Sequence, residues 1–465
     1  MTNYTDTICA PATSVGTGAI SIVRLSGPAT MDVLDRVVRF RKGTAAAAHG
    51  YTVKYGSVGD LDEVLVLLFR APHSYTGEDA AEISCHASPF IVSSLLDKLT
   101  EAGCRLAEPG EFTRRAFVNG KMDLAQAEAV ADVIASTSSA QHRVAMNQLR
   151  GGYSAELREL RKQLLEVTSL LELELDFSEE DVEFADRSRL RALLEAATAH
   201  CRQLADSFRL GNAVKNGVPV AIVGAPNSGK STLLNALLRD DRAIVSDIPG
   251  TTRDTVEETC VIDGVLFRFI DTAGIRDASD EVERLGIERS FRALSGAEIV
   301  LGVVDISVPE KDVLAAVRMI MEKVDPSGQK LLILANKCDV LEVNKNVITL
   351  NNFVFRTGNQ NDLTNVLEIS AKTGSGLENV RSALVSNAGL AAATGTLVTN
   401  ARHAAALREA AAALSAVSDG LDRALPSDLL AEDLRAALAS LGSITGEITT
   451  DEVLGEIFAK FCIGK

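Results

Sequence analysis

The sequence predicts a multidomain protein that combines an α+β part, a helical part and an α/β part. Its 465 residues, 46% of them hydrophobic, are too many for one hydrophobic core and fit three domains of about 150 residues each. Strand-like stretches near the N-terminus give way to helical periodicity after Met122. A central stretch then alternates strands and helices, and helical periodicity returns near the C-terminus.

The first part of the chain, residues 1–120, contains short apolar stretches separated by Gly and Pro. The clearest are residues 19–25 and 63–69, which predict strands of an α+β domain. In residues 121–215 the apolar positions instead recur every three or four residues, most regularly over 157–175. This spacing predicts the first part of a helical domain.

A glycine-rich segment, GAPNSGKS at residues 224–231, follows the apolar run 218–223 and precedes an apolar helical pattern. This order of strand, loop and helix is the context that a phosphate-binding loop requires. The glycines let the backbone approach a phosphate, Lys230 supplies a positive charge, and the Ser231 hydroxyl can ligate magnesium. Taken alone, such a turn is also ordinary α/β architecture.

Four later segments follow in the order that a GTPase needs: GTTRD at 250–254, DTAG at 271–274, NKCD at 336–339 and SAK at 370–372. Asp271 can hold magnesium through water, while the Gly274 amide can meet the γ-phosphate. The Asp339 carboxylate can accept two hydrogen bonds from guanine that adenine lacks. A polar strand-end turn would explain any one segment, but five in order predict GTP binding.

Position 275 is an isoleucine, whereas small switch GTPases resembling Ras place there a glutamine that orients the attacking water. An apolar side chain cannot do this. The polar segment 276–284 is the candidate source of the missing group, although it also reads as a solvated, acid-rich helix start.

The helical pattern resumes at 401–417 and 429–441, so residues 386–465 form a second helical part. The nucleotide-binding domain, residues 216–385, is therefore predicted to be inserted into the helical domain. The alanine-rich tract 391–413 is predicted to be a packed helix because Leu407 and Leu414 are spaced for one face.

Charge and cysteine usage limit the partners and the compartment. The formal net charge of -16 does not suit a protein that grips nucleic acid by bulk electrostatics, so any RNA contact must be local or shared with a partner. The seven cysteines show no Cys-x-x-Cys spacing, which predicts reduced and mostly buried thiols. We expect a cytoplasmic protein with no membrane span, because no leader pattern or long apolar run is present.

The GTPase segments, with Asn227 in the loop, resemble the TrmE-Era-EngA-like (Era/Der/MnmE) group of GTPases. The C-terminal residues 462–465, CIGK, are similar to a signature of the MnmE (TrmE) family of tRNA-modifying GTPases. Three N-terminal segments also resemble that family: YTGED at 75–79, PGEF at 109–112 and KMDLAQAEA at 121–129. The resemblance covers essentially the whole chain and is least distinctive around residues 186–215 and in the middle of the C-terminal helices.

The resemblance implies a potassium-dependent GTP hydrolase with Glu283, Lys230 and Asn227 as catalytic residues. Asn227, Ser246, Ile248 and Thr251 would hold K⁺, and Ser231 and Thr252 would hold Mg²⁺; for Asn227 the alternative is a loop-shaping amide. The residues expected to contact GTP are Asn227, Ser228, Gly229, Lys230, Ser231, Thr232, Ser246, Asp247, Ile248, Pro249, Gly250, Thr251, Thr252, Asp271, Thr272, Ala273, Gly274, Asn336, Lys337, Cys338, Asp339, Ser370, Ala371 and Lys372.

The N-terminal part resembles a tetrahydrofolate-binding fold, and the family pattern implies a 5-formyl-tetrahydrofolate site at Arg24, Glu78, Lys121 and Lys465. The cations can meet the glutamate tail or the pterin carbonyl, and Glu78 can accept the paired donors of the pterin edge. Without the family, Arg24 at a strand end and Lys121 at a helix start read as ordinary surface charges.

The resemblance further implies a homodimer formed by the N-terminal domain and a heterotetramer with the FAD-binding protein MnmG. Together they would add a carboxymethylaminomethyl or aminomethyl group to C5 of the wobble uridine, U34, of certain tRNAs. The carbon would come from 5,10-methylene-tetrahydrofolate. Cys462 is either a nucleophile or a packing residue. A ribosome-assembly GTPase and a signalling switch are the alternative classes.

Overall fold

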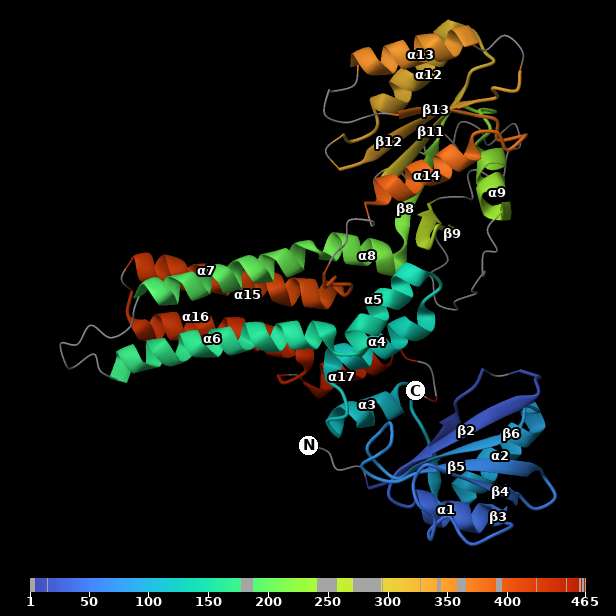
Figure 1. Ribbon diagram of the computed structural model, residues 1–465, viewed down its shortest axis with the longest axis vertical. Coiled ribbons are helices and arrows are strands. Elements are labelled where there is room, and N and C mark those ends of the chain that lie inside the picture. The colour runs from blue at the N-terminus through green and yellow to red at the C-terminus, as the bar shows by residue number, and fades with distance from the viewer. Residues whose placement is uncertain are drawn as a thin grey trace. The chain divides into compact units, whose positions relative to one another are not determined.

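The computed structural model describes residues 5–14, 16–176, 187–240, 257–270, 294, 296–326, 328–340, 344–357, 365–389, 395–423, 425–448, 450–459, 461 and 464 (Figure 1). The chain forms two compact units. The first unit comprises Met1–Ile134, Met146–Thr198 and Glu409–Lys465. The second unit comprises Ala135–Ala145 and Ala199–Arg408.

A seven-stranded sheet begins the first unit. Its strands are β1 (Thr7–Pro11), β2 (Ile20–Ser26), β3 (Arg39–Phe40), β4 (Thr52–Ser57), β5 (Glu63–Phe69), β6 (Ala80–His86) and β7 (Cys104–Leu106). They are ordered β3-β4-β5-β6-β2-β1-β7, and every pair is antiparallel except the parallel pair β1 and β7.

Helices α1 (Thr30–Val37) and α2 (Pro89–Glu101) cover one face of this sheet. Alternate strand residues such as Val64, Val66 and Leu68 are buried against them. Leu65, which alternates with them along β5, and Val53 of the neighbouring strand β4 are exposed on the opposite face. The sheet therefore has one covered face and one open face.

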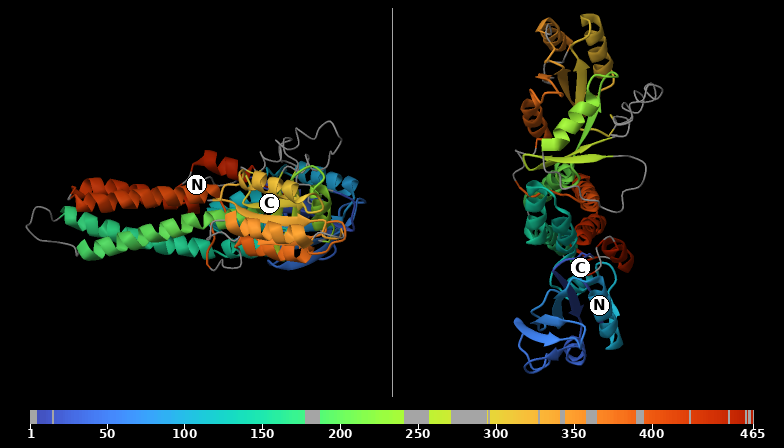
Figure 2. Two further views of the ribbon diagram at one scale, coloured as in Figure 1. Left: turned by 90° about the horizontal axis from the view of Figure 1, so that it is seen from above. Right: turned by 90° about the vertical axis from the view of Figure 1, so that its right-hand side faces the viewer.

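The helices of the first unit follow the sheet, and four of them, α4, α5, α7 and α15, have residues in both units. They are α3 (Glu111–Val118), α4 (Leu124–Ala135), α5 (Ser139–Leu149), α6 (Gly152–Asp176), α7 (Arg187–Asp206), α15 (Ala401–Asp422), α16 (Ser427–Thr445) and α17 (Asp451–Phe458). Helices α6 and α16 pack side by side (Figures 1 and 2). Phe458 and Phe461 pack with Leu124 and Ala127, which ties the C-terminal segment to α4.

The second unit contains a six-stranded sheet ordered β13-β12-β11-β8-β10-β9. Its strands are β8 (Val218–Val223), β9 (Glu258–Ile262), β10 (Val265–Phe269), β11 (Ile299–Asp305), β12 (Lys330–Asn336) and β13 (Asn365–Ile369). Its helices include α8 (Phe208–Asn216), α9 (Lys230–Asp240), α12 (Glu310–Met321), α13 (Asn344–Thr357) and α14 (Leu377–Ala388). Only β9 and β10 pair antiparallel among these strands.

Both faces of this second sheet are buried. Along β8, Val220 and Ile222 enter one apolar core while Ala221 and Val223 enter another on the opposite face. A strand buried on both faces needs the continuous apolar sequence that β8 has. This arrangement is that of a mostly parallel α/β sheet with helices on both sides (Figure 1).

Most elements predicted from the sequence are confirmed, with three corrections. Strands 218–223 and 63–69 have the expected bounds. In the described part of the alanine-rich tract, which begins at residue 395, the helix starts at Ala401, and residues 395–400 are not helical. Arg24 lies inside β2 and not at a strand end, and Lys121 lies in the turn before α4.

Five of the six described cysteines are buried and Cys338 is half-buried, all of them as free thiols. Within the described residues, no helix has the length and apolar character that crossing a bilayer requires.

Candidate functional site

The glycine-rich loop connects β8 to α9 with a geometry that few residues can adopt. Asn227 has φ 58° and Gly229 has φ 100°, both in the left-handed region. A Cβ atom at Gly229 would lie 2.1 Å from Nδ2 of Asn336. Glycine is therefore required there for the loop to approach the NKCD segment.

The polar groups of the loop are arranged to meet an anion. The Lys230 ammonium donates to the carbonyl oxygens of Gly224 and Ala225, at 2.9 Å each, and so lies over the loop. Ser231 and Thr232 follow in the first turn of α9, where the helix dipole favours negative charge. The buried Ser228 hydroxyl has no hydrogen-bond partner among the described residues, so it can still bind a polar ligand or water.

Asn336 joins the phosphate loop to the SAK segment. Its side chain is buried at the end of β12, where Nδ2 donates to the Ser228 carbonyl at 2.7 Å. Its Oδ1 accepts from the Ala371 amide at 2.9 Å. The Asn336 amide thus holds together the phosphate loop, the NKCD segment and the SAK segment, which are more than 30 residues apart in the sequence.

The next residue, Lys337, is held by a carboxylate that the sequence analysis did not single out. Asp305 ends β11 directly opposite Asn336, and its Oδ2 accepts from the Lys337 ammonium at 2.5 Å. Burial alone would raise the pKa of Asp305, but hydrogen bonds from Lys337 and Ser307 outweigh it and hold the pKa below its ordinary value. Lys337 has φ 73°, so its backbone is also constrained.

Asp339 and Cys338 complete the NKCD segment. A hydrogen bond from Ser370 lowers the pKa of Asp339, which keeps this carboxylate ionised as a hydrogen-bond acceptor. Partial burial, with the Asp339 charge, raises the pKa of the Cys338 thiol, so this cysteine is not an activated nucleophile. Lys372 lies beside Asp339 and also favours its ionised form.

Several predicted nucleotide-site residues lie outside the described residues, so their placement stays a prediction. They are Ser246, Asp247, Ile248, Pro249, Gly250, Thr251, Thr252, Asp271, Thr272, Ala273, Gly274 and Glu283.

A second candidate site lies in the first unit, around the predicted folate residues. Arg24 donates from Nη2 and Nε to Glu82 at 2.8 and 3.0 Å, and from Nη1 to the Gly464 carbonyl at 3.2 Å. Its guanidinium also lies 5.7 Å from the ring centres of Tyr75 and Phe112. Arg24 is therefore a half-buried cation with a hydrogen bond from each of its three nitrogens, and not an ordinary surface charge.

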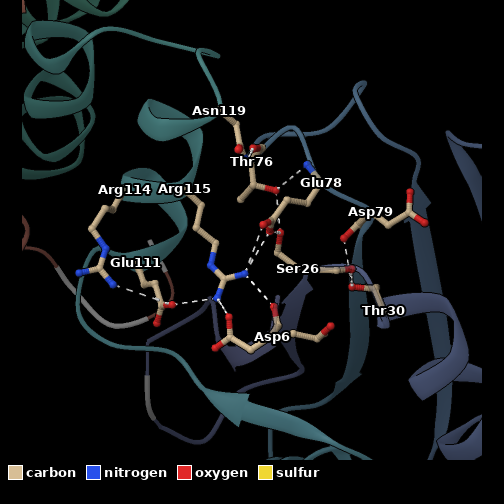
Figure 3. A network of polar contacts seen from close by, with 12 residues as sticks. Asp6, Ser26, Thr30, Thr76, Glu78, Asp79, Glu111, Arg114, Arg115 and Asn119 are labelled. Atoms are coloured by element: carbon tan, nitrogen blue, oxygen red, sulfur yellow. Dashed lines mark hydrogen bonds and ion pairs between the residues drawn. The ribbon is translucent and has the colours of Figure 1, made fainter. Parts of the chain in front are cut away.

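Glu78 is held by two donors (Figure 3). The Ser26 hydroxyl donates to Oε2 at 2.7 Å, and Nη1 of Arg115 lies 3.3 and 3.4 Å from the two carboxylate oxygens. Arg115 is completely buried, and it also donates to Oδ1 of Asp6 at 2.8 Å and to Oε1 of Glu111 at 3.0 Å. One buried guanidinium therefore aligns three carboxylates.

Glu111 is the second fully buried charge of this network. Burial would raise its pKa, but hydrogen bonds from Arg105, the Glu108 amide and Arg115 outweigh that effect and lower the pKa below 4.5. The same balance lowers the pKa of Asp6, where the opposing donors are Arg105 and Arg115. Both Asp6 and Glu111 are therefore held in the ionised form at neutral pH.

Lys121 and the C-terminus approach the same region from other parts of the first unit. The Lys121 side chain packs on Gly77, next to Glu78, and its ammonium donates to the Pro72 carbonyl at 3.0 Å. Gly464 has φ 92°, and a Cβ atom there would lie 2.1 Å from the Pro11 carbonyl oxygen. The structure thus brings Arg24 to the C-terminal segment, while Lys465 itself is outside the described residues.

The sequence analysis missed the residues that position these groups: Asp6, Ser26, Glu82, Glu111, Arg115 and Asp305. Glu111 was noticed only as part of the PGEF segment. A carboxylate at the end of a buried strand was the available signal for Asp305, but nothing local marks Arg115 as a buried residue.

The loop between β8 and α9, with strand-end polar segments at β11, β12 and β13, defines a P-loop nucleotide-binding protein. Residues 7–121 match a family model described as the GTP-binding protein TrmE N-terminus, and residues 124–462 match one described as the MnmE helical domain.

Relatives of similar length match the chain over nearly its whole sequence. A tRNA modification GTPase MnmE of Parabacteroides distasonis is 50% identical over 99% of this chain and 100% of its own length. Proteins of the same name from Bacteroides thetaiotaomicron and Cytophaga hutchinsonii are 49% and 47% identical, each over 99% or more of both chains. The chain belongs to the MnmE family of tRNA modification GTPases.

Proposed function

We propose that this protein hydrolyses GTP and uses the nucleotide cycle to modify tRNA. The observation that carries the proposal is the Asn336 amide, which holds the phosphate loop and the SAK segment together. The ionised Asp339 beside this clamp supplies the acceptor that distinguishes guanine from adenine. Family membership over the full length supplies the tRNA substrate class.

The phosphate loop supports binding of a nucleotide and its metal ions. The Gly229 backbone lets the loop approach Asn336, and the Lys230 ammonium and buried Ser228 hydroxyl supply donors. Ser231 and Thr252 would hold Mg²⁺, and Asn227, Ser246, Ile248 and Thr251 would hold K⁺. A bound K⁺ would neutralise charge that develops on the phosphate oxygens during hydrolysis. Glu283 would orient the attacking water.

The first unit fits a tetrahydrofolate derivative, 5-formyl or 5,10-methylene, at Arg24, Glu78, Lys121 and Lys465. Glu78 is ready to accept the paired donors of a pterin edge, because Ser26 and Arg115 fix its carboxylate. Lys121 is exposed, and among the described residues its ammonium donates to the Pro72 carbonyl and to no carboxylate, so it can turn toward an anionic glutamate tail. The one-carbon unit for the tRNA would come from this site.

The chain would be organised as a folate-binding and dimerisation domain (1–120), a helical domain (121–215 and 386–465) and an inserted GTPase domain (216–385). It would work in the cytoplasm as a homodimer and, with the FAD-binding MnmG, as a heterotetramer. The products would be carboxymethylaminomethyl or aminomethyl groups on C5 of the wobble uridine U34. The second helical part would bring Cys462 and Lys465 to the folate.

Reconstitution tests this proposal. The full chain, the flavoprotein, tRNA, 5,10-methylene-tetrahydrofolate, a nitrogen donor and GTP are incubated, and the tRNA nucleosides are then analysed. We expect modified uridine only when all components are present, and no product with GDP in place of GTP. Product formed equally well without GTP or without this chain would refute the proposal.

A further inference from the structure

Helix α5 begins against the nucleotide-binding sheet. Its residues 139–145 belong to the second unit, whereas its residues from Met146 onward belong to the first. Ala140 and Val144 lie one helical turn apart, and both pack against the apolar core that β8 and β10 share. Because a helix is a rigid element, this one continuous segment links the nucleotide-binding sheet to the first unit.

The first turn of α5 is fixed by a capping box. The Ser138 hydroxyl accepts a hydrogen bond from the Gln141 amide at 3.2 Å, and Oε1 of Gln141 accepts from the amides of Thr137 and Ser138 at 2.8 and 2.9 Å. Nε2 of Gln141 donates to the Lys215 carbonyl at 2.8 Å. Lys215 lies in the last turn of α8, shortly before β8 and the phosphate loop. Gln141 therefore ties the start of α5 to the segment that leads into the nucleotide site.

The same turn of α5 contacts the hairpin formed by β9 and β10. Asp263 and Gly264 make the two-residue connection, with φ 49° and 79°, as in a type I′ turn. The Gly264 carbonyl accepts from the Ala140 amide at 3.4 Å. A Cβ atom at Gly264 would lie 2.4 Å from Oγ of Ser139. The hairpin and the helix are therefore packed with no space for a side chain between them.

The hairpin connects two of the segments that are predicted to contact the γ-phosphate and its magnesium. GTTRD ends at residue 254 and β9 begins at Glu258, while β10 ends at Phe269 and DTAG begins at residue 271. In the described sheet, β9 is an edge strand that pairs with β10 alone. Because an edge strand is hydrogen-bonded on one side only, a change at either segment can displace this hairpin.

We propose that the contact between the Gly264 turn and residues 139–141 of α5 transmits the state of the bound nucleotide to the first unit. The first turn of α5 is docked on the hairpin in one state and released from it in the other, which supplies the two-state element that coupling between sites requires. The proposal rests on the nucleotide-driven tRNA modification proposed above. It adds the contact through which the nucleotide cycle acts on the rest of the molecule.

Hydrogen exchange of the full chain tests this contact. The chain is loaded with GDP or with the β,γ-imido analogue of GTP, and exchange is measured for the amides of Ala140 and Gln141. We expect the two nucleotides to give exchange rates that differ about five- to 150-fold, the typical range of allosteric coupling. Gly264→Ala should remove this difference, because the added Cβ atom displaces the Ser139 hydroxyl.

A second substitution identifies the clash as the cause. In Gly264→Ala/Ser139→Ala the Oγ atom is gone, and the Cβ atom of residue 139 lies 3.8 Å from the added methyl group, so the nucleotide difference should return. Gly389→Ala is the matched control. Gly389 also has a positive φ, 68°, but an added Cβ atom there meets nothing within 4 Å. This variant carries similar backbone strain without the contact, so it should respond to nucleotide as the wild type does.

The reconstituted reaction gives a second readout. Gly264→Ala should lower kcat for tRNA modification several-fold, while GTP affinity, the KM for tRNA and GTP hydrolysis stay unchanged. The double variant should recover the wild-type kcat. A substitution that only destabilised the hairpin would instead reduce GTP affinity, and Ser139→Ala would not rescue it.

Three outcomes overturn the inference. Exchange in α5 that is the same with both nucleotides in the wild type would show that the contact is a fixed anchor. A nucleotide response in Gly264→Ala equal to that of the wild type would exclude this contact as the route. Loss of GTP affinity in Gly264→Ala that persists in the double variant would assign the defect to the turn itself. A wild type whose α5 responds to nucleotide but which does not modify tRNA would refute the proposed function and leave the contact standing.

Discussion

The nucleotide site of the second unit and the carboxylate network of the first unit are built in different ways. In the second unit, short segments at strand ends supply the groups, and each segment carries several functional residues together. In the first unit, Asp6, Glu78 and Glu111 come from separate parts of the sequence, and the buried Arg115 contacts all three. The first kind of site leaves a continuous pattern in the sequence, whereas the second depends on the folded structure.

The largest expected effect is a loss of stability in the first unit when the buried Arg115, rather than the exposed Arg105, is replaced. Arg115→Met leaves buried carboxylates without their partner and should destabilise this unit by about 3–5 kcal/mol. Arg105→Met removes a guanidinium that pairs with the same Asp6 and Glu111 but is 45% exposed, so it should cost less than about 1 kcal/mol. Hydrogen exchange of the β1 and α3 amides in the full chain measures the loss of stability in both variants. Similar losses for the two variants would contradict the assigned role of burial.

The next effect concerns the clamp of the second unit. Asn336→Ala removes two buried hydrogen bonds and should weaken nucleotide binding by about 2–3 kcal/mol, or roughly 30- to 150-fold. Asn346→Ala is the matched control, because its amide also donates twice to carbonyls, those of Ile306 and Val308, away from the loop. Titration with a fluorescent GDP analogue measures both variants, and equal weakening would show that the clamp has no special role.

The next effect is the response of the carboxylate network in the first unit to acid. Because the pKa values of Asp6 and Glu111 are lowered in the folded state, the stabilisation from them is present above their ordinary values of 3.8 and 4.5 and is lost as pH falls below these. Glu111→Gln should flatten the acid limb of the exchange profile in the first unit. Glu101→Gln, at an exposed helix end, is the control and should leave the profile unchanged. An acid limb that survives Glu111→Gln intact would argue against the network.

The smallest effect tests how the first unit positions its ligand. Ser26→Ala removes one of the two donors to Glu78 and should weaken binding of 5-formyl-tetrahydrofolate about fivefold while GTP turnover stays constant. Ser21→Ala is the control on the same strand, since the Ser21 hydroxyl pairs with Thr13 on the other face of the sheet. Calorimetric titration of both variants gives the comparison, and unchanged folate affinity in Ser26→Ala would remove Ser26 from the site.

The sequence was informative wherever local pattern decides structure. Strand β8 and the loop after it were predicted to the residue, because an apolar run followed by GAPNSGKS has one common structural meaning. The pairing of Arg24 with Glu82 was not predictable, because it depends on the register of β2 against β6, 58 residues apart in the chain. Asp305 was missed for the same reason: its function comes from the parallel neighbour β12.

The C-terminal segment shows both sides of this limit. The CIGK pattern indicated the family and placed the end of the chain among the functional residues. The reason for its glycine appears only in the fold, where Gly464 lies against the Pro11 carbonyl and accepts a hydrogen bond from Arg24. A short pattern can therefore indicate which residues matter while the contacts that make them matter remain a property of the tertiary structure.

Phosphate release from GTP by the full chain, measured in KCl and in NaCl of equal concentration with ATP as the competing nucleotide, tests the central claim most directly. The account predicts hydrolysis that is several-fold faster in potassium and unaffected by excess ATP. Equal rates in the two salts would contradict the proposed cation site around Asn227. Inhibition by ATP as strong as that by GDP would contradict the guanine site formed by Asn336 and Asp339.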